Sequence, residues 1–411
     1  MTNNTSSSEK RAGIRASRRG FLQAAGVTAL GGAALAYPAR MDGGLIRSAY
    51  AQDGDAEFIK SKDLDALIRH SDKTYETKRN FIGTSVVTSN DVFFVRANLP
   101  EPSASILDDR NAWEVSIEGV TNPGTTTLGD LKTMGVETVA MVLQCSGNGR
   151  AFFDHDASGS QWTVGAAGCA IWSGVPLKAV VEAMGGAADG AKFVTGTGGE
   201  SLPEGIDPMT VIVERSVPIE AMENALLAWE MNGEPIPLAH GGPLRIVYPG
   251  YYGVNNVKYL TKVALTETET EAAIQQSGYR VRPVGEKGAP DQPSMWEMAV
   301  KSWVTNPIET ASAGKVQITG VAMGGVDAVT KVEVSTDGGE NWQEARFVGP
   351  DLGKFAWRPF VLETELSAGT HTIASRATNE AGDTQPEDFP PNHRGYAHNG
   401  WKAHAVDVKV G

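Results

Sequence analysis

The segment Lys331–Gly339, which reads KVEVSTDGG, gives the clearest indication of the fold of this 411-residue chain. Polar and apolar residues alternate along its first five positions, the period of a strand with one buried face. The Asp-Gly-Gly sequence that follows is typical of a hairpin turn. Similar short strands are expected at Lys315–Thr319, His371–Arg376 and His404–Val410. Several short strands separated by turns predict a β-sandwich in this part of the chain.

The part of the chain that precedes the sandwich has a different pattern. Strand-like runs such as Trp113–Ile117 alternate with segments of helical periodicity, and glycine-rich loops lie between them. Helices are expected at Leu177–Met184 and Ile219–Trp229, and an Asn232-Gly233 turn follows the second. This alternation predicts a mixed α/β domain.

A linker is expected between the two parts. The segment Arg280–Pro293 scatters prolines and glycines among charged residues. A length of 411 residues also exceeds that of one ordinary domain. We therefore expect an α+β fold, with a mixed α/β domain over residues 52–285 and a β-sandwich domain over residues 286–411.

Residues 1–51 are interpreted as an export signal rather than as a basic tail with a short helix. Ser17–Leu22 reads SRRGFL, a twin-arginine pattern, and a mildly apolar stretch follows at Ala24–Ala36. Ala49-Tyr50-Ala51 resembles a cleavage signature, so that Gln52 is the expected mature start. Because this route exports folded proteins, often with a complex cofactor, the pattern predicts a periplasmic redox protein.

The charge of the expected mature chain restricts its partners. Residues 1–51 hold seven of the 36 basic and two of the 49 acidic residues, which leaves 29 basic and 47 acidic residues, a formal charge of −18. Such a chain disfavours nucleic acid and anionic membranes as partners, and it favours a basic protein. No apolar run after the N-terminal region is long enough to span a bilayer.

The chain has two cysteines, Cys145 and Cys169, and their roles stay open at this point. In an oxidising compartment one disulfide is the default expectation. Cys145 lies in Leu143–Arg150, where an apolar run leads into a loop of small and polar residues that ends in arginine. Small residues let a bulky group approach, and a nearby arginine favours the metal-binding thiolate. No C-x-x-C-H motif and no cysteine cluster occurs, so no haem or iron–sulfur centre is expected on this chain.

Several separated motifs occur in an order that favours a metal-ligand role for Cys145 over the default expectation of a disulfide. They are Phe93–Pro100, Leu143–Arg150, Trp162–Gly165, Trp172–Leu177, Glu230–Pro235, His240–Arg245, Val257–Leu260, Trp357-Arg358 and Arg394-Gly395 with Trp401. Together they resemble the sulfite oxidase family of molybdenum enzymes over nearly all of residues 85–411. The resemblance implies a molybdopterin-binding domain followed by an immunoglobulin-like dimerisation domain, and hence a homodimer. This order agrees with the division inferred from periodicity.

The resemblance also implies which residues bind the cofactor, molybdenum with molybdopterin. Cys145 matches the cysteine that ligates the metal, and Cys169 has no counterpart and is interpreted as a structural thiol. Contacts to the pterin and its phosphate are expected from Phe94, Val95, Arg96, Ala97, Asn98, Asp207, His240, Arg245, Asn256, Val257 and Lys258.

Five residues match positions that the family uses for its substrate, a small oxyanion. They are Arg96, Arg150, Trp162, Tyr279 and Arg358. Arginine suits such a site because it stays charged and donates hydrogen bonds in a fork. For each residue a structural role is the alternative: a surface ion pair for the arginines, core packing for the tryptophan, and a satisfied buried hydroxyl for the tyrosine. Asn98 departs from several family members, which have a histidine there that can titrate near neutral pH.

The expected activity is a two-electron oxidation of sulfite to sulfate in the periplasm, with a separate c-type cytochrome as electron acceptor. Two relatives with the same cofactor class are alternatives: a sulfane dehydrogenase subunit and a periplasmic methionine-sulfoxide reductase. The second needs no arginine cluster, because its substrate is neutral. A binding module that has lost its metal is a further alternative, against which the retained Cys145 and pterin motifs argue.

Overall fold

A computed structural model describes residues 58–411, and the expected export signal lies outside these residues. Strands make up most of the regular structure. Among the described residues the α-helices are α2 (Leu128–Leu131) and α3 (Leu177–Ala183), while single 3-10 turns and one π-helical segment connect many of the strands. No helix in residues 58–411 is long and apolar enough to cross a membrane.

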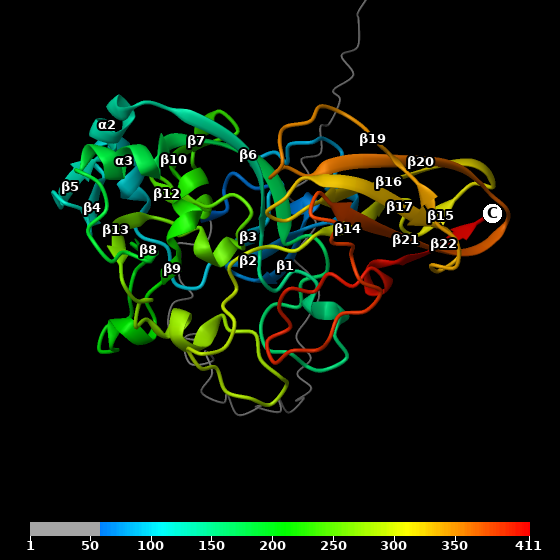
Figure 1. The fold of residues 1–411 in the computed structure, drawn as a ribbon. Helices are drawn as coiled ribbons and strands as arrows, with labels where there is room; N and C mark the ends of the chain where they lie inside the picture. The colour runs from blue at the N-terminus through cyan, green and yellow to red at the C-terminus, as the bar shows by residue number, and fades with distance from the viewer. Residues whose placement is uncertain (1–57) are drawn as a thin grey trace, which may run out of the picture. The chain divides into compact units, whose positions relative to one another are not determined.

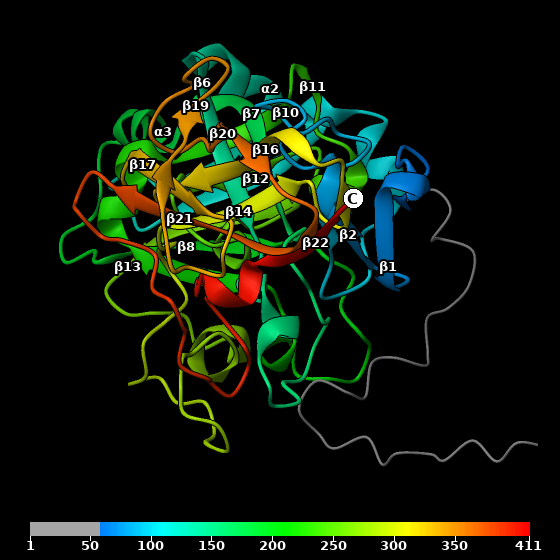
Figure 2. The ribbon, with the colours of Figure 1, turned by 90° about the vertical axis from the view of Figure 1, so that its right-hand side faces the viewer.

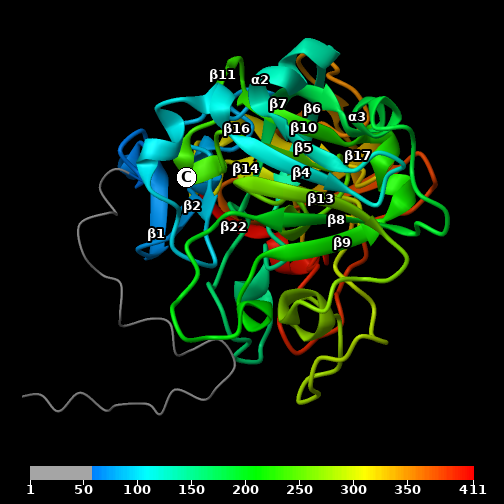
Figure 3. The same cartoon turned by 90° about the vertical axis from the view of Figure 1, so that its left-hand side faces the viewer.

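Three sheets form the first part of the described chain (Figures 1 and 3). One has the order β1 (Leu67–Ser71), β2 (Thr74–Thr77), β3 (Val95–Arg96). The second has the order β11 (Glu234–Pro235), β10 (Leu226–Met231), β7 (Ala167–Pro176), β6 (Glu137–Gln144), with β12 (Arg245–Val247) paired to β10. The third has the order β5 (Gly124–Thr127), β4 (Glu114–Glu118), β13 (Leu260–Thr266), β8 (Phe193–Gly198), β9 (Glu214–Pro218).

Two sheets form the second part, whose strands face the viewer in Figure 2. The first has the order β14 (Lys301–Asn306), β16 (Gly314–Met323), β20 (Arg358–Leu366), β19 (Arg346–Phe347). The second has the order β15 (Thr310–Ala311), β22 (Val406–Val410), β21 (Gly369–Asn379), β17 (Val329–Ser335), β18 (Gln343–Glu344).

Alternating residues of these two sheets form the core of the sandwich. Val332 and Val334 of β17 are fully buried, and they share a cluster with Ile318 of β16 and Phe360 of β20. Each of the two sheets therefore buries one face against the other. The β-sandwich predicted from the period-two pattern is confirmed.

Strand β6 determines where Cys145 lies. It is exposed at Glu137 and fully buried from Met141 onward, so that it runs from the surface into the interior. It pairs antiparallel with β7, and Gln144 lies opposite Ala167. Cys145 therefore follows the buried end of a central strand, where a rigid sheet fixes its backbone.

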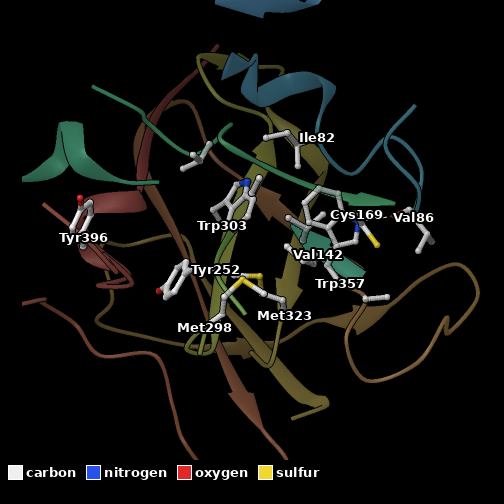
Figure 4. Packing of buried hydrophobic residues seen from close by; sticks show 14 of the residues in the cluster. Ile82, Val86, Val142, Cys169, Tyr252, Met298, Trp303, Met323, Trp357 and Tyr396 are labelled. Atoms are coloured by element: carbon white, nitrogen blue, oxygen red, sulfur yellow. Dashed lines mark hydrogen bonds between the residues drawn. The ribbon is translucent and has the colours of Figure 1, made fainter. Parts of the chain in front are cut away.

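The sandwich packs directly on the sheet that carries Cys145. One cluster combines Val142 and Cys169 of the first part with Trp303 and Trp357 of the second, as Figure 4 shows. The Trp357 indole donates a hydrogen bond of 2.7 Å to the Val86 carbonyl. Because large buried side chains of both parts interlock here, the second part helps to hold the strand that leads to Cys145.

One local prediction was wrong. The helix expected at Ile219–Trp229 is a short 3-10 segment, Ile219–Asn224, followed by β10, because the apolar run Leu226–Met231 pairs with β7 and β12. Tertiary pairing here overrides a helical pattern. The linker Arg280–Pro293 is an ordered loop: Val281 donates to the Pro293 carbonyl at 2.8 Å, and Arg280 is buried and paired with Glu269.

Candidate active site

A cavity lies between the ends of several strands of the first part. Eleven of the sixteen residues predicted for the site line it. These are Phe94, Arg96, Ala97, Asn98, Cys145, His240, Arg245, Asn256, Val257, Lys258 and Tyr279. These residues come from five separate stretches of sequence, and the fold brings them to one cavity.

The Cys145 loop is fixed by hydrogen bonds on both sides. The Cys145 amide donates to the Ala166 carbonyl at 2.9 Å, and the Asn148 amide donates back to the Cys145 carbonyl at 2.9 Å. The second part also contributes, because the Ala397 amide donates to the Ser146 carbonyl at 2.9 Å. Cys145 is 9% exposed. The sulfur is thus held by a rigid loop at the wall of the cavity.

Both cysteines are free, so the default expectation of a disulfide was wrong. Cys169 is fully buried in the shared core, and burial raises its pKa to about 12. A thiol held in its neutral form is unreactive and packs as a small apolar group. The structure therefore gives the two cysteines different environments: a core thiol, and a thiol at a cavity.

Positive charge gathers on one wall of the cavity. Arg245 is 2% exposed, and its guanidinium donates to the carbonyls of His240 and Asn256 at 2.7 and 2.6 Å. Lys258 donates to the Ala239 carbonyl at 2.7 Å, and burial, with Arg245 nearby, lowers its pKa to about 7. Burial also lowers the pKa of His240 well below its ordinary value. Cationic side chains that are buried close together favour the binding of an anionic ligand.

Glu200 is a lining residue that the sequence analysis missed. It lines the cavity, and burial raises the pKa of its carboxyl to about 7. Asp207, which was predicted instead, lies in an exposed loop and accepts a hydrogen bond of 3.0 Å from the Met209 amide. The glycine-rich run before Glu200 leaves this stretch without periodicity. The informative signal was its position directly after strand β8, which ends at Gly198.

Strand alternation explains why Val95 of the early motif does not reach the cavity. Phe94, Arg96, Ala97 and Asn98 line it, whereas Val95 is fully buried in a separate cluster. Successive side chains of a strand point to opposite faces, so Val95, on β3 beside Arg96, points away. The resemblance marked the whole motif without distinguishing its two faces.

Arg150 stands one layer behind the cavity wall. Its Nε donates to the Arg394 carbonyl at 2.8 Å, and its guanidinium lies 5.6 Å from the centre of the Tyr396 ring. That ring stacks on Tyr279 with 5.2 Å between ring centres and 6° between planes. Burial lowers the pKa of Arg150, while the nearby Cys145 and Tyr279 raise it.

Arg394 of the second part belongs to the same group. It hydrogen-bonds the side chain of Tyr396, and its charge acts to lower the pKa of both Tyr396 and Arg150. The Arg394-Gly395 motif was noted in the sequence without a role. Only the packing of residues 394–397 against the Cys145 loop connects it to the site.

Arg358, the arginine predicted to reach the site from the second part, lies elsewhere. It forms an ion pair with Asp351 at 2.5 Å, and its guanidinium lies 4.8 Å from the centre of the Phe347 ring. Its neighbour Trp357 is fully buried in the shared core. Because adjacent residues of an extended chain point to opposite sides, Arg358 faces away from that core.

Trp162 is buried next to the site but does not line the cavity. It is fully buried in a cluster that includes Cys145 and Phe94. The loop that carries it is held by Glu76, whose carboxylate accepts hydrogen bonds of 2.9 Å from the amides of Thr163 and Gly165. Trp162 thus supports the wall from behind rather than forming it.

The residues present fit a large anionic metal cofactor. A thiol at the wall is a soft ligand that suits a metal such as molybdenum. Three buried polar atoms of residues that line the cavity have no hydrogen-bond partner among the described residues: Ser146 Oγ, Glu200 Oε2 and Arg245 Nε. A ligand with donors as well as acceptors would satisfy them. A pterin ring has both, and its phosphate suits the cationic wall.

Comparison with known proteins agrees with this chemistry. Residues 102–274 match the oxidoreductase molybdopterin binding domain, and residues 292–410 match the Mo-co oxidoreductase dimerisation domain. The order of the two domains is the one expected from the sequence, and the predicted fold class is confirmed.

Individual relatives point in the same direction. The chain is 31% identical to mitochondrial sulfite oxidase of Macaca fascicularis over 395 residues, which cover 87% of this chain and 70% of the relative. It is 29% identical to sulfite oxidase of Arabidopsis thaliana, over 82% of this chain and 91% of the relative. The sulfane dehydrogenase SoxCD of Paracoccus pantotrophus has a similar structure, with a TM-score of 0.69, 25% identity, and coverage of 82% of this chain and 86% of that one. The chain belongs to the sulfite oxidase family of molybdenum oxidoreductases.

Proposed function

We propose that this protein oxidises sulfite to sulfate at a molybdenum–molybdopterin centre. The observation that carries the proposal is a single cavity that combines the Cys145 thiol with a cationic wall and with three arginines at or behind its surface: Arg96, Arg150 and Arg394. Sulfite is a small, strongly hydrated anion. A site that removes it from water must replace that hydration with fixed charge and donors.

The residues of the site divide into two groups by position. Arg245, Lys258, His240 and Glu200 would hold the pterin and its phosphate, while Cys145 would hold the metal. When bound, the centre accepts two electrons and supplies the oxygen atom that sulfite gains. The protein binds the cofactor, orients the substrate and keeps the two in contact.

The substrate side is formed by residues around Tyr279. Arg96 lines the cavity and can pair with a sulfite oxygen, and the Tyr279 phenol can donate to another. Arg150 and Arg394 supply positive charge from behind the stacked tyrosines. Arginine keeps its charge even where burial lowers its pKa, so this field persists across the physiological pH range.

A sulfane dehydrogenase is the second candidate, and the structural similarity to SoxCD favours it. That activity would require access for sulfur bound to a protein. The three arginines, and the identity of about 30% to several sulfite oxidases, favour free sulfite.

The periplasm, a c-type cytochrome and a homodimer complete the proposal. The twin-arginine pattern at Ser17–Leu22 supports export, and the formal charge of −18 supports a basic electron acceptor. The match of residues 292–410 to a dimerisation domain supports a homodimer formed through the sandwich. Light scattering of the purified protein would test this, and a monomer at micromolar concentration would contradict it.

Metal analysis combined with two assays tests the activity. We expect one molybdenum per chain and rapid reduction of ferricyanide by sulfite. The same preparation is then assayed with a sulfane-loaded carrier protein. Oxidation of the carrier without turnover of sulfite would replace the first candidate with the second.

A further inference from the structure

A buried lysine outside both matched domains contacts a residue of the cavity. Lys62 precedes strand β1 and is 9% exposed. Its ammonium lies 2.5 Å from Nε2 of His240, which lines the cavity. It also contacts two main-chain carbonyls, those of Asn90 and, at 2.9 Å, of Phe93. The domain models begin at residue 102, so neither includes it.

The contacts of Lys62 match the donors of an ammonium group. An ammonium has three N–H donors and no acceptor. Two of them are taken by the carbonyls of Asn90 and Phe93, and the third faces His240 Nε2. If the ammonium donates to this nitrogen, Nε2 must present its lone pair, and the proton of the neutral ring then resides on the other nitrogen, Nδ1.

The surroundings keep His240 neutral. It is 2% exposed, and burial lowers its pKa, with further lowering by the charges of Lys62, Lys258 and Arg245. A neutral imidazole has one donor and one acceptor, and their order is set by the partner of one nitrogen. His240 therefore needs such a partner to present a defined group to a ligand.

We infer that Lys62 is a positioning residue of the cofactor site: it donates to Nε2 of His240 and so makes Nδ1 the N–H donor of the ring. This assignment rests on the proposed function, in which His240 contacts the pterin side of an anionic cofactor. A donor suits the oxygen atoms of such a ligand, whereas the opposite form would turn a lone pair toward them.

Main-chain hydrogen bonds hold the segment around Lys62 in place. The Lys62 amide donates to the Ile59 carbonyl at 2.9 Å, and the Asp63 amide donates to the Asp91 carbonyl at 3.1 Å. The short segment is thus tied to the loop before β3; that loop supplies Phe94 to the cavity, and β3 supplies Arg96. The segment that carries Lys62, which precedes the matched molybdopterin-binding domain, therefore contributes to the surroundings of the cavity.

One other arrangement of the His240 ring competes with this assignment. The Asn90 carbonyl also lies within reach of the His240 ring, so Nε2 could instead carry the proton and donate to that oxygen. Lys62 would then serve only to satisfy main-chain carbonyls. The two arrangements differ in which ring nitrogen is protonated.

Nuclear magnetic resonance of full-length, cofactor-loaded, oxidised protein labelled with 15N-histidine distinguishes them. The His240 signals are assigned by their loss in His240→Gln. We expect an Nδ1-protonated neutral ring in the wild type, and a change of form or a mixture in Lys62→Met. An Nε2-protonated ring in the wild type overturns the inference without any variant at Lys62, and so does a Lys62→Met spectrum in which the His240 signals are unchanged.

Cofactor content gives a second readout. Loss of an outer-shell partner typically weakens binding by about 10–100-fold, so purified Lys62→Met should hold less molybdenum and less pterin per chain than the wild type. Lys60→Met removes the same charge two residues away, at an exposed position, and should keep full content. Equal content in both variants overturns the inference. A wild type without sulfite turnover but with the expected His240 form would contradict the proposed function alone.

Discussion

At the scale of single residues, the chemistry depends on where each charged or nucleophilic side chain points. Cys145 and Cys169 are the same residue type, and, as their motifs predicted, one lies at a cavity and the other in a core. Arg358 and Arg394 both come from the second part, yet Arg394 lies beside Arg150 and Arg358 pairs with Asp351. Orientation, rather than residue type, separates the members of each pair.

Cys145→Ser tests the metal ligand. A hydroxyl is a poor ligand for molybdenum, so we expect the variant to fold and be exported but to lose molybdenum and sulfite oxidation. The replacement is nearly isosteric and leaves the loop hydrogen bonds of the main chain intact. Metal analysis and the ferricyanide assay measure the outcome. Full activity of the variant would exclude Cys145 as the ligand.

Arg394→Ala and Arg358→Ala form a matched pair. Removing a charge-assisted contact costs about 1.5–3 kcal/mol, or roughly tenfold or more in affinity. We expect Arg96→Ala to raise the KM for sulfite by about that factor, and Arg394→Ala to raise it by a smaller factor, because Arg394 supplies its charge from behind the cavity wall. Arg358→Ala should leave the KM near the wild-type value, because its side chain pairs with Asp351. Steady-state kinetics decide, and the reverse order would restore the original assignment to Arg358.

At the scale of secondary-structure elements, strands determine the site by where they end. Strand β6 carries the chain to Cys145, β3 carries it to Arg96, and β8 ends just before Glu200. The sandwich acts on the same loop from outside. Lys301, the first residue of β14, is fully buried and donates to the Asn148 carbonyl at 3.1 Å. One strand of the second part is thereby joined to the Cys145 loop of the first.

Lys301→Met separates the positioning of this loop from stability. Methionine has a similar volume, and replacing a buried charge with an apolar group is often neutral for folding. The loop, however, loses the donor to Asn148. We expect a thermal midpoint close to that of the wild type and a clearly lower kcat. Thermal unfolding and steady-state assays measure both, and an unchanged kcat would show that the contact does not position the loop.

At the scale of the whole molecule, burial of charge links stability to pH. Burial lowers the pKa of Lys62, Lys258 and Lys301 to about 7 in each case. In the unfolded chain their pKa returns to its ordinary value near 10.5. Between about pH 7 and about pH 10 the unfolded chain therefore holds more protons than the folded one, and stability increases with pH.

Cofactor-free protein, made in a host that lacks molybdopterin, should show this increase in its thermal midpoint as the pH is raised from about 7 to about 10. Lys301→Met should reduce the slope because one of the three lysines is gone. Loaded protein should also show a smaller slope, because an anionic ligand restores the charge of Lys62 and Lys258. A midpoint that falls across this range would contradict the explanation.

The net charge leads to a prediction about electron transfer. If a basic cytochrome c is attracted to the expected mature chain, with its formal charge of −18, its kcat/KM should fall as salt is added. Screening shortens the field to about 8 Å at physiological ionic strength. Steady-state reduction of a purified cytochrome c over a series of salt concentrations measures this. If kcat/KM did not change with salt, attraction between opposite charges would not explain the docking of the cytochrome. Fast peroxide formation from oxygen would show that the protein is an oxidase.

Residue patterns and motifs were enough to predict the family, the order of the two domains, the sandwich strands and most of the residues that line the cavity. These features depend on local periodicity and on motifs that are each contiguous in the chain. The choice between two acids and between two arginines, by contrast, follows from tertiary contacts. The structure favours Glu200 and Arg394, it adds Lys62, and it agrees with the motif in placing Cys145 at the cavity. The physical reason is that burial and side-chain direction follow from contacts between segments far apart in sequence, and no local pattern records those contacts.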